Sequence, residues 1–526
     1  MKYFSTRGGD ERLSFEEAVL TGLAPNGGLY IPLEIPSLPE NWEALWADYT
    51  FQQLSHAILS LFISPDEISS KELQILIDRS YENFRHPEVT PVVPIGDKLH
   101  VLELWHGPTY AFKDVALQLL GNLFEFFLKR RNVGKVGKAR DKLTVVGATS
   151  GDTGSAAIYG LRNKLDISIF ILHPKGRVSP IQEAQMTTVT DPNVHNIAVK
   201  GTFDDCQDIV KALFADKEFN ATHRLGAINS INWARILAQT VYYFSAYFHV
   251  KRQLPSPSAQ IQFVVPSGNF GDALAGWYAK RMGLPMAQLG IATNANDILA
   301  RFWQTGRYEK NDASSGPGSG GVKETLSPAM DILVSSNFER LLWYLAFESL
   351  QGDESAETKR LKACEVLKGW MDSVKIDGKA VVPTAVLELA RKEFVADRAS
   401  DSLTAETIKS YYTAKPPYIA DPHTAVGLAV ARVFAQYNEP NIHQVVLSTA
   451  HPAKFSEAVT MSLSGMGLDF DKEVLPEEFK GLLEKPRRVK DVEAAEVALV
   501  KHVIEKALEH DTEVQEAKAH SGKVSS

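Results

Sequence analysis

The sequence predicts an α/β protein in which parallel sheets are covered by helices on both faces. From about Leu99 onward, apolar runs of strand length alternate with stretches of helical period, such as residues 155–162 and 205–214. The apolar runs are residues 142–146, 167–172, 196–199, 260–265 and 444–447. Gly, Pro or polar turns bound these runs, and such alternation favours parallel sheets. A short apolar run alone does not distinguish a strand from a buried helix.

The first ninety or so residues have a helical pattern that Pro and Gly interrupt. Ser14 followed by Glu17 is a capping signature for a helix over residues 14–21. Residues 26–32 (NGGLYIP) predict a turn that leads into a short extended piece. We therefore predict a mainly helical N-terminal domain over residues 1–95. The other predicted parts are an α/β domain over 96–240, a larger α/β domain over 241–485, and a C-terminal helix and tail over 486–526.

Composition limits the class of protein. A chain of 526 residues is too long to fold around one hydrophobic core. Its length suggests two to four domains of roughly 100–200 residues each. The net charge of −8 argues against nucleic acid as a general partner. Two cysteines, Cys206 and Cys364, are too few for a disulfide scaffold or a metal cluster. No apolar leader or membrane-length apolar run occurs, so we expect a cytoplasmic protein without membrane or metal.

Residues 264–272 (VVPSGNFGD) begin as the end of an apolar run. The run leads into Ser267 and two glycines, and a helical pattern follows. Gly268 and Gly271 allow the backbone to approach a ligand closely. The amides at the start of the following helix, together with its dipole, form an anion site that suits phosphate. A tight strand-to-helix turn that binds nothing is the alternative.

A second loop of this kind spans residues 145–154 (VVGATSGDTG). It offers backbone amides and the hydroxyls of Thr149, Ser150 and Thr153, which suit a carboxylate or a phosphate. Asp152 is unusual in an anion site, and a polar turn without a ligand is an equal alternative. Two such loops indicate a ligand with two anionic ends. Neither loop matches a nucleotide-binding motif.

Lys113 stands where a Gly-Pro turn gives way to an apolar helix, directly after Phe112. Apolar surroundings disfavour the ammonium form, and the neutral amine is a nucleophile that forms Schiff bases. The alternative is an exposed lysine at the helix start, which is the common situation for lysines.

Two further stretches carry groups for binding. Ser448 and Thr449 follow an apolar run, where ligands of parallel sheets gather, although routine strand-end hydrogen bonds would also explain them. Residues 227–239 place Asn229 and Ser230 in a turn and Arg235 just inside a helix. Arginine binds phosphate through paired hydrogen bonds, but a structural arginine is an equal alternative. The histidines near these motifs, His106, His423 and His451, are predicted to pack or to form hydrogen bonds.

Taken together and in this order, the motifs resemble the threonine synthase family in its longer form with an extra N-terminal domain. The resemblance covers most of the chain and rests on the segments HGPTYAFKD, GATSGDTGSAA, NSINWARILAQ, PSGNFGD, SPAMDI, DPHTAVG and LSTAHPAKF. It implies the β-family (fold-type II) pyridoxal-phosphate (PLP) fold, which tryptophan synthase β and threonine dehydratase share. It also implies a cytoplasmic lyase of threonine biosynthesis, a monomer or small homo-oligomer, whose substrate is O-phosphohomoserine.

The resemblance also implies the roles of individual residues. Lys113 would hold PLP as a Schiff base and move protons, and Thr449 would bind the pyridine nitrogen. The cofactor phosphate would lie on Gly268, Asn269, Phe270 and Gly271. The substrate carboxylate and the cofactor ring would face Ser150, Gly151, Asp152 and Thr153. The substrate phosphate would be held by Asn229, Ser230, Arg235 and Thr149.

The same motifs would serve a PLP-dependent phospho-lyase that releases a keto acid. A non-catalytic protein that kept the fold is the alternative outside enzymes, although Lys113 and the glycine loop argue against it. A threonine or serine dehydratase would leave the residues for a substrate phosphate unexplained.

Overall fold

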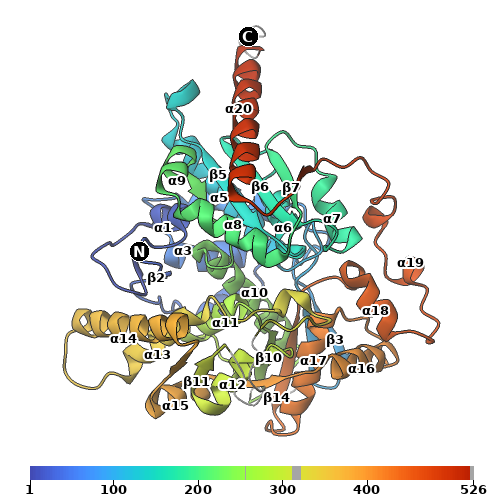
Figure 1. The fold of residues 1–526 in the computed structure, drawn as a ribbon. Helices are drawn as coiled ribbons and strands as arrows, with labels where there is room; N and C mark the ends of the chain where they lie inside the picture. Colours follow the sequence, from blue (N-terminus) through green and yellow to red (C-terminus); the bar gives the residue numbers. More distant parts are fainter. Residues whose placement is uncertain (255, 257, 311–320, 522–526) are drawn as a thin grey trace. The chain divides into compact units, whose positions relative to one another are not determined.

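The structure is a computed structural model that describes residues 1–254, 256, 258–310 and 321–521. The chain forms two compact units, which can be followed by colour in Figure 1. The first unit comprises residues 1–116 and 230–474, and the second comprises residues 117–229 and 475–526. Each unit is described by itself below.

The N-terminal region of the first unit is mainly helical, as predicted. Its helices are α1 (Phe15–Thr21), α2 (Trp42–Trp46), α3 (Phe51–Phe62) and α4 (Ser70–Tyr81). Ser14 and Glu17 form the predicted capping box at the start of α1. The extended piece after the turn is β2 (Tyr30–Pro32), which pairs antiparallel with β1 (Tyr3–Ser5).

A six-stranded sheet forms the centre of the first unit. Its order is β13 (Phe394–Arg398), β10 (Leu289–Thr293), β9 (Gln260–Pro266), β14 (Ile442–Ser448), β4 (Leu99–Glu103) and β3 (Val92–Gly96). Neighbouring strands are parallel except for β3 and β4, which are antiparallel. The prediction of parallel strands does not hold for this edge pair, because a connection of two residues can join only antiparallel neighbours.

Helices cover both faces of this sheet. Val264 of β9 faces an apolar core that includes Val426 and Val430 of α17 (Pro422–Ala435). The adjacent Phe263 points to the opposite face, where its ring packs edge-on against Tyr243 of α10 (Trp233–Lys251). The other helices of this unit are α11 (Gly271–Met282), α12 (Ile298–Thr305), α13 (Phe338–Ser349), α14 (Ala356–Ile376), α15 (Thr384–Glu393), α16 (Asp401–Tyr412), α18 (Ser456–Ser462) and α19 (Phe470–Glu473). A small ribbon pairs β11 (Arg307–Glu309) with β12 (Lys379–Val381).

The second unit contains a five-stranded parallel sheet. Its order is β15 (Lys490–Val492), β7 (Val194–Val199), β6 (Ile167–Pro174), β5 (Leu143–Ala148) and β8 (Leu225–Gly226). Apolar side chains of β5, β6 and β7 form a core with α8 (Phe203–Ala215) and α20 (Val497–Ser521). The other helices are α6 (Asp152–Leu161), α7 (Pro180–Thr187) and α9 (Lys217–His223), and α5 (Lys113–Arg131) enters this unit at Leu117.

The predicted α/β class with two largely parallel sheets is therefore confirmed. All five apolar runs fall on strands, namely β5, β6, β7, β9 and β14. The two compact units cut the chain at other places than the predicted limits, and they group residues 1–95 with the larger sheet. The predicted division into residues 1–95, 96–240, 241–485 and 486–526 stays a prediction.

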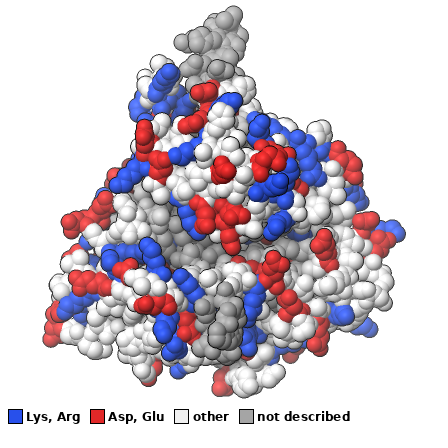
Figure 2. All heavy atoms as spheres, viewed as in Figure 1, with Lys and Arg blue, Asp and Glu red and all other residues white. Residues whose placement is uncertain are grey.

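The distribution of charge on the surface and the length of the apolar helices both bear on the predictions from composition. On the face that Figure 2 shows, basic and acidic side chains are interleaved rather than gathered by sign. Within the described residues, no helix has the length and apolar character that crossing a bilayer requires.

Candidate active site

The carboxyl ends of three neighbouring parallel strands organise the candidate site in the first unit. β9 and β14 run in register, with Val264 beside Val446, and β14 pairs in turn with β4. Loops that follow adjacent parallel strands emerge at the same edge of the sheet, where ligands of α/β proteins bind. The predicted glycine loop follows β9, and Thr449 follows β14. Residues 104–113, the lysine segment, follow β4.

The lysine segment is fastened to the end of β14 by its backbone. Leu104 donates its N–H to the carbonyl of Ser448 at 3.0 Å, and Phe112 donates to the carbonyl of Thr449 at 2.7 Å. Lys113 begins α5, and only 8% of its surface is exposed. The alternative of an exposed lysine is therefore wrong, and the predicted burial of Lys113 is confirmed; its reactivity stays a prediction.

Asp114 fixes the turn that precedes Lys113. Its fully buried carboxylate accepts hydrogen bonds from the N–H and the hydroxyl of Thr109, each at 2.7 Å. Burial raises the pKa of Asp114 to about 6, although the Thr109 donors oppose this shift. The ammonium of Lys454 donates to the Thr109 carbonyl at 2.8 Å. This network holds the start of α5 in one conformation.

The predicted anion site at residues 268–271, the cradle, is a strand–turn–helix junction. Ser267 donates its N–H to the carbonyl of Ala292 at 2.8 Å, and α11 begins at Gly271. Phe270, the residue before the helix, has a φ of 62° in the left-handed region, which costs a non-glycine residue roughly 1–2 kcal/mol. Its buried ring stacks on Trp303 and packs edge-on against Phe338. Burying a phenylalanine gains about 1.5–3 kcal/mol, which offsets the strain.

A short turn at Pro328–Met330 closes over the cradle. A Cβ on Gly268 would lie 3.1 Å from the Met330 Cα and 3.3 Å from the Ala329 carbonyl oxygen. Ser335 donates its hydroxyl to the Gly268 carbonyl at 2.6 Å, and Asn337 donates its N–H to the Asn269 carbonyl at 3.0 Å. The cradle backbone is therefore fixed from outside, and a side chain at position 268 would fit only if the turn at 328–330 shifted by a few tenths of an ångström.

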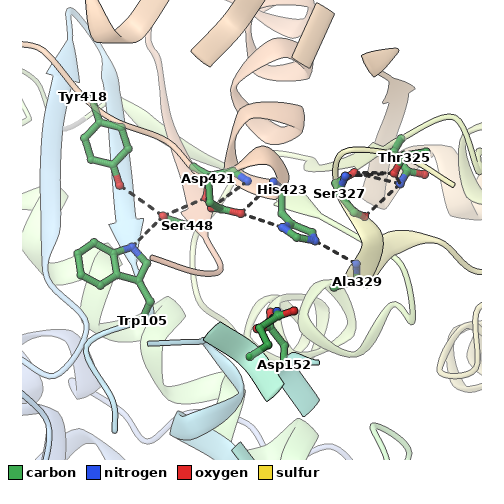
Figure 3. A network of polar contacts seen from close by, with 12 residues as sticks. Trp105, Asp152, Thr325, Ser327, Ala329, Tyr418, Asp421, His423 and Ser448 are labelled. Atoms are coloured by element: carbon green, nitrogen blue, oxygen red, sulfur yellow. Dashed lines mark hydrogen bonds and ion pairs between the residues drawn. The ribbon is translucent and has the colours of Figure 1, made fainter. Parts of the chain in front are cut away.

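A buried polar network connects this turn with the end of β14 (Figure 3). The Ala329 N–H donates to Nε2 of His423 at 3.1 Å, so Nδ1 of that ring carries the proton that Asp421 accepts at 2.8 Å. Asp421 also accepts from the Thr424 hydroxyl, which contacts Ser448 at 3.0 Å. The prediction that His423 forms hydrogen bonds is confirmed.

The same network separates the roles of Ser448 and Thr449. Trp105 donates its indole N–H to the Ser448 hydroxyl at 3.0 Å, and Tyr418 donates its hydroxyl at 3.3 Å (Figure 3). Together with Thr424, these donors engage the Ser448 oxygen. Thr449 is therefore the better candidate for a ligand contact at this strand end, and it is largely buried with 7% exposed surface.

Two of the predicted substrate-phosphate residues lie in the first unit. The Ser230 carbonyl accepts from Nδ2 of Asn337 at 3.1 Å, and the Ser230 hydroxyl lies 3.3 Å from that of Ser336. Arg235 stands in the first turn of α10 and is 4% exposed. Burial lowers the pKa of this guanidinium to about 10, which leaves it charged at neutral pH and favours contact with an anion. Asn229 is exposed and belongs to the second unit.

The predicted carboxylate loop lies in the second unit, at the exit of β5. The Thr149 hydroxyl oxygen accepts from the N–H groups of Gly151 at 3.0 Å and Gly154 at 2.9 Å. Asp152 accepts from Nε2 of Gln182 at 2.9 Å, which holds its carboxylate in place. Gly151 has a φ of 151°, and a Cβ there would lie 2.3 Å from Oε1 of Gln182.

The structure thus collects most of the predicted cofactor residues in one unit. Lys113, residues 268–271 and Thr449 surround one sheet edge of the first unit, which also contains Ser230 and Arg235. Residues 149–153 and Asn229 lie in the second unit, and their contribution to the same site stays a proposal.

Comparison with known proteins agrees with this arrangement. Residues 2–81 match the family model for the threonine synthase N terminus, residues 85–349 match that for PLP-dependent enzymes, and residues 424–504 match that for the threonine synthase C-terminal region. Threonine synthase of Schizosaccharomyces pombe is 55% identical over 515 residues, which cover 97% of this chain and 99% of that protein. Threonine synthase of Saccharomyces cerevisiae is 54% identical over 521 residues and covers 96% and 98%. The chain belongs to the threonine synthase family.

Solved structures of threonine synthases share the fold. The yeast crystal structure superposes with a TM-score of 0.90 at 53% identity, and the alignment covers 97% of this chain and 99% of that one. The PLP-bound enzyme from Brucella melitensis gives a TM-score of 0.84 at 40% identity and covers 96% and 99%. The predicted PLP fold and the dependence on PLP are confirmed.

The residues of the first unit fit the cofactor of the threonine synthase family. Within the described residues, the buried Ser267 hydroxyl has no hydrogen-bond partner, which fits a donor to a bound phosphate. A Cβ at Gly271 would lie 3.3 Å from Nδ2 of Asn337, a tight contact that the glycine avoids. Burial raises the pKa of Asp272, the next residue, to about 7, which reduces its repulsion of an anion.

The turn at residues 328–330 and its histidine support were not predicted as functional. Both belong to segments that carry the family resemblance, SPAMDI and DPHTAVG. The only local signal was Asp421 followed by proline, which is typical of a helix start. The hydrogen bond from Ala329 to His423 joins residues 94 positions apart, so no local pattern could indicate it.

Proposed function

We propose that this chain is a threonine synthase that converts O-phospho-L-homoserine and water to L-threonine and phosphate. The observation that carries the proposal is the buried Lys113 at the start of α5, directly after Phe112, which is hydrogen-bonded to Thr449. Thr449 follows β14, the neighbour of the strand that leads into the glycine cradle. An amine, a ring-nitrogen partner and an anion cradle are the three features that PLP requires.

These positions support the proposed binding roles. Lys113 would bond to the aldehyde carbon of PLP, Thr449 would hydrogen-bond the ring nitrogen, and Gly268, Asn269, Phe270 and Gly271 would cradle the phosphate at the start of α11. When bound, the cofactor supplies an electron sink for negative charge that develops on the substrate. A neutral hydroxyl at the ring nitrogen does not enforce its protonation.

The proton transfers are proposed for Lys113. Its amine would take the proton from the substrate Cα, release that proton, and then take one from Cβ. The carbon–oxygen bond at Cγ breaks, and the electron pair leaves with the phosphate. Water then adds a hydroxyl to Cβ. Of the three protons released from Cα, Cβ and water, two return to Cγ and Cα, which completes threonine, and one stays with the phosphate.

The substrate's two anionic ends are assigned to separate groups. Arg235 and Ser230, with Asn229 and Thr149, would receive the phosphate, because a desolvated guanidinium gives strong charge-assisted hydrogen bonds. The carboxylate is assigned to Ser150, Gly151, Asp152 and Thr153. Asp152 would offer its backbone N–H to this carboxylate, because its own side chain is an acceptor that Gln182 holds.

Product analysis tests this proposal. Purified protein incubated with O-phosphohomoserine should release threonine and phosphate in equal amounts. A keto acid in place of threonine would indicate a phospho-lyase, and absence of both products would indicate a protein that kept the fold without catalysis. Lys113→Ala should remove both turnover and the visible absorption of the bound cofactor, whereas the exposed control Lys368→Ala should keep both.

We also propose that the protein works in the cytoplasm as a monomer or small homo-oligomer, with a small-molecule substrate as its partner. Cys206 and Cys364 are both free and buried, which is compatible with a reducing compartment. Light scattering of the purified protein measures the oligomeric state.

A further inference from the structure

The N-terminal region touches the elements around the cradle through specific polar contacts. Asn232, at the start of α10, donates its Nδ2 to the carbonyl of Val19 at 2.9 Å. The Thr6 hydroxyl donates to Oε1 of Glu339 at 2.7 Å, and Arg7 forms an ion pair with the same carboxylate. These contacts join the N-terminal region to α13 and to residues 230–232, the turn that is proposed to bind the substrate phosphate.

Arg340, the next residue of α13, is fully buried, and each of its three nitrogens donates to a different element. Nε donates to the Tyr30 carbonyl of β2 at 3.0 Å, and Nη2 donates to the Ile231 carbonyl at 2.7 Å. Nη1 donates to Oδ1 of Asn337. Burial lowers the pKa of Arg340 to about 10, so the group remains charged at neutral pH. A planar guanidinium can reach three acceptors in this way, whereas a lysine ammonium offers one point of charge.

Asn337 extends these contacts to both phosphate sites. It donates its Nδ2 to the Ser230 carbonyl at 3.1 Å and its N–H to the Asn269 carbonyl at 3.0 Å. Arg340 therefore contacts the turn after Ser230 directly, and it orients the side chain that holds Ser230. It is also connected to the cofactor cradle through one intervening residue.

We propose that Arg340 is a positioning residue for the substrate phosphate, and that the N-terminal region acts on the active site through it. The proposal rests on the proposed function. Arg340 does not touch the substrate. It fixes the Ile231 carbonyl and Asn337, and these fix the path of residues 230–232 that aims Ser230 and Arg235. The contacts of β2 with Nε and of Thr6 with Glu339 keep the guanidinium oriented.

This role differs from a purely structural one in what it changes. If the guanidinium only stabilises the fold, replacing it would lower the melting temperature and leave the kinetics of the folded enzyme unchanged. If it positions the phosphate turn, replacing it weakens binding of phosphate-bearing ligands, so the KM rises more than kcat falls. Inorganic phosphate, as a competitive inhibitor, reports on the same turn without requiring turnover.

The test uses Arg340→Lys in the PLP-loaded full-length protein. The expected result is a rise of about tenfold in both the KM for O-phosphohomoserine and the inhibition constant of inorganic phosphate. The cofactor absorption should persist, and amide hydrogen exchange at residues 230–236 should accelerate. Arg391→Lys is the matched control, because Arg391 also donates to two backbone carbonyls, at 2.9 and 2.8 Å, between α12 and α15. The control should leave both constants, the cofactor absorption and the hydrogen exchange unchanged.

A second variant keeps the proposal testable if Arg340→Lys does not fold. Thr6→Val removes one hydroxyl from the N-terminal region, and it should raise the same two constants by about threefold. Unchanged constants and unchanged exchange at residues 230–236 in the folded variants overturn the proposal. Failure of the wild-type protein to release threonine overturns the proposed function instead, and hydrogen exchange with and without inorganic phosphate still tests Arg340.

Discussion

Adding one methyl group at Gly268 should weaken binding of the cofactor without unfolding the protein. The new Cβ would lie 3.1 Å from the Met330 Cα and 3.3 Å from the Ala329 carbonyl oxygen, which are both backbone atoms. The turn at 328–330 cannot simply move aside, because its Ala329 N–H is bound to His423 at 3.1 Å. Either this hydrogen bond lengthens or the cradle shifts.

The size of the effect follows from the contact. Overpacking of a fixed site costs about 1–3 kcal/mol, and we assign this cost to the cofactor-bound form, whose cradle cannot relax. At about 1.4 kcal/mol per factor of ten, the PLP dissociation constant of Gly268→Ala should rise by about 5- to 150-fold. His423→Ala frees the turn, so the double variant should lose about 1 kcal/mol less than the sum of the two single variants.

The assay is a titration of the apoprotein with PLP, followed by absorption, together with thermal unfolding of each apoprotein. Gly369→Ala is the matched control, since a Cβ at Gly369 of α14 has no neighbour within 4 Å. It should leave PLP affinity unchanged and stabilise the helix by roughly 0.5–1 kcal/mol. A dissociation constant for Gly268→Ala within a factor of two of wild type would refute the reasoning, as would strictly additive effects with His423→Ala.

Three further variants test other parts of the site. Gly151→Ala places a Cβ 2.3 Å from Oε1 of Gln182 at a φ of 151°, so KM should rise about tenfold, and an unchanged KM contradicts the strained turn. Thr449→Val should weaken PLP binding about two- to tenfold through loss of one hydrogen bond, as measured by the same titration. Burial raises the pKa of Asp272 to about 7 from 3.8, so the protonated form stabilises the fold at low pH and this contribution is lost as the pH rises towards about 7. The unfolding free energy of wild type relative to Asp272→Asn should therefore fall between about pH 4 and 7, and a constant difference would rule out the shift.

Much of the site could be predicted from local sequence, because each part has a short-range cause. Apolar neighbours predicted that Lys113 is buried, and the glycines after a strand predicted the cradle at Gly268–Gly271. The capping box at Ser14 and Glu17 likewise needs only four residues of sequence. In such segments, the residues that determine the conformation are close in the chain.

The sequence by itself determined the alternation of strands and helices, the family, and the motifs that carry the chemistry. Only the tertiary structure decided which polar groups meet. Arg340 and the Tyr30 carbonyl are 310 positions apart, and His423 and Ala329 are 94 apart. A buried donor must find an acceptor somewhere, but periodicity and propensity carry no information about which distant one it finds. Packing of the sheet and its helices makes that choice, and it therefore determines how firmly the predicted residues are held.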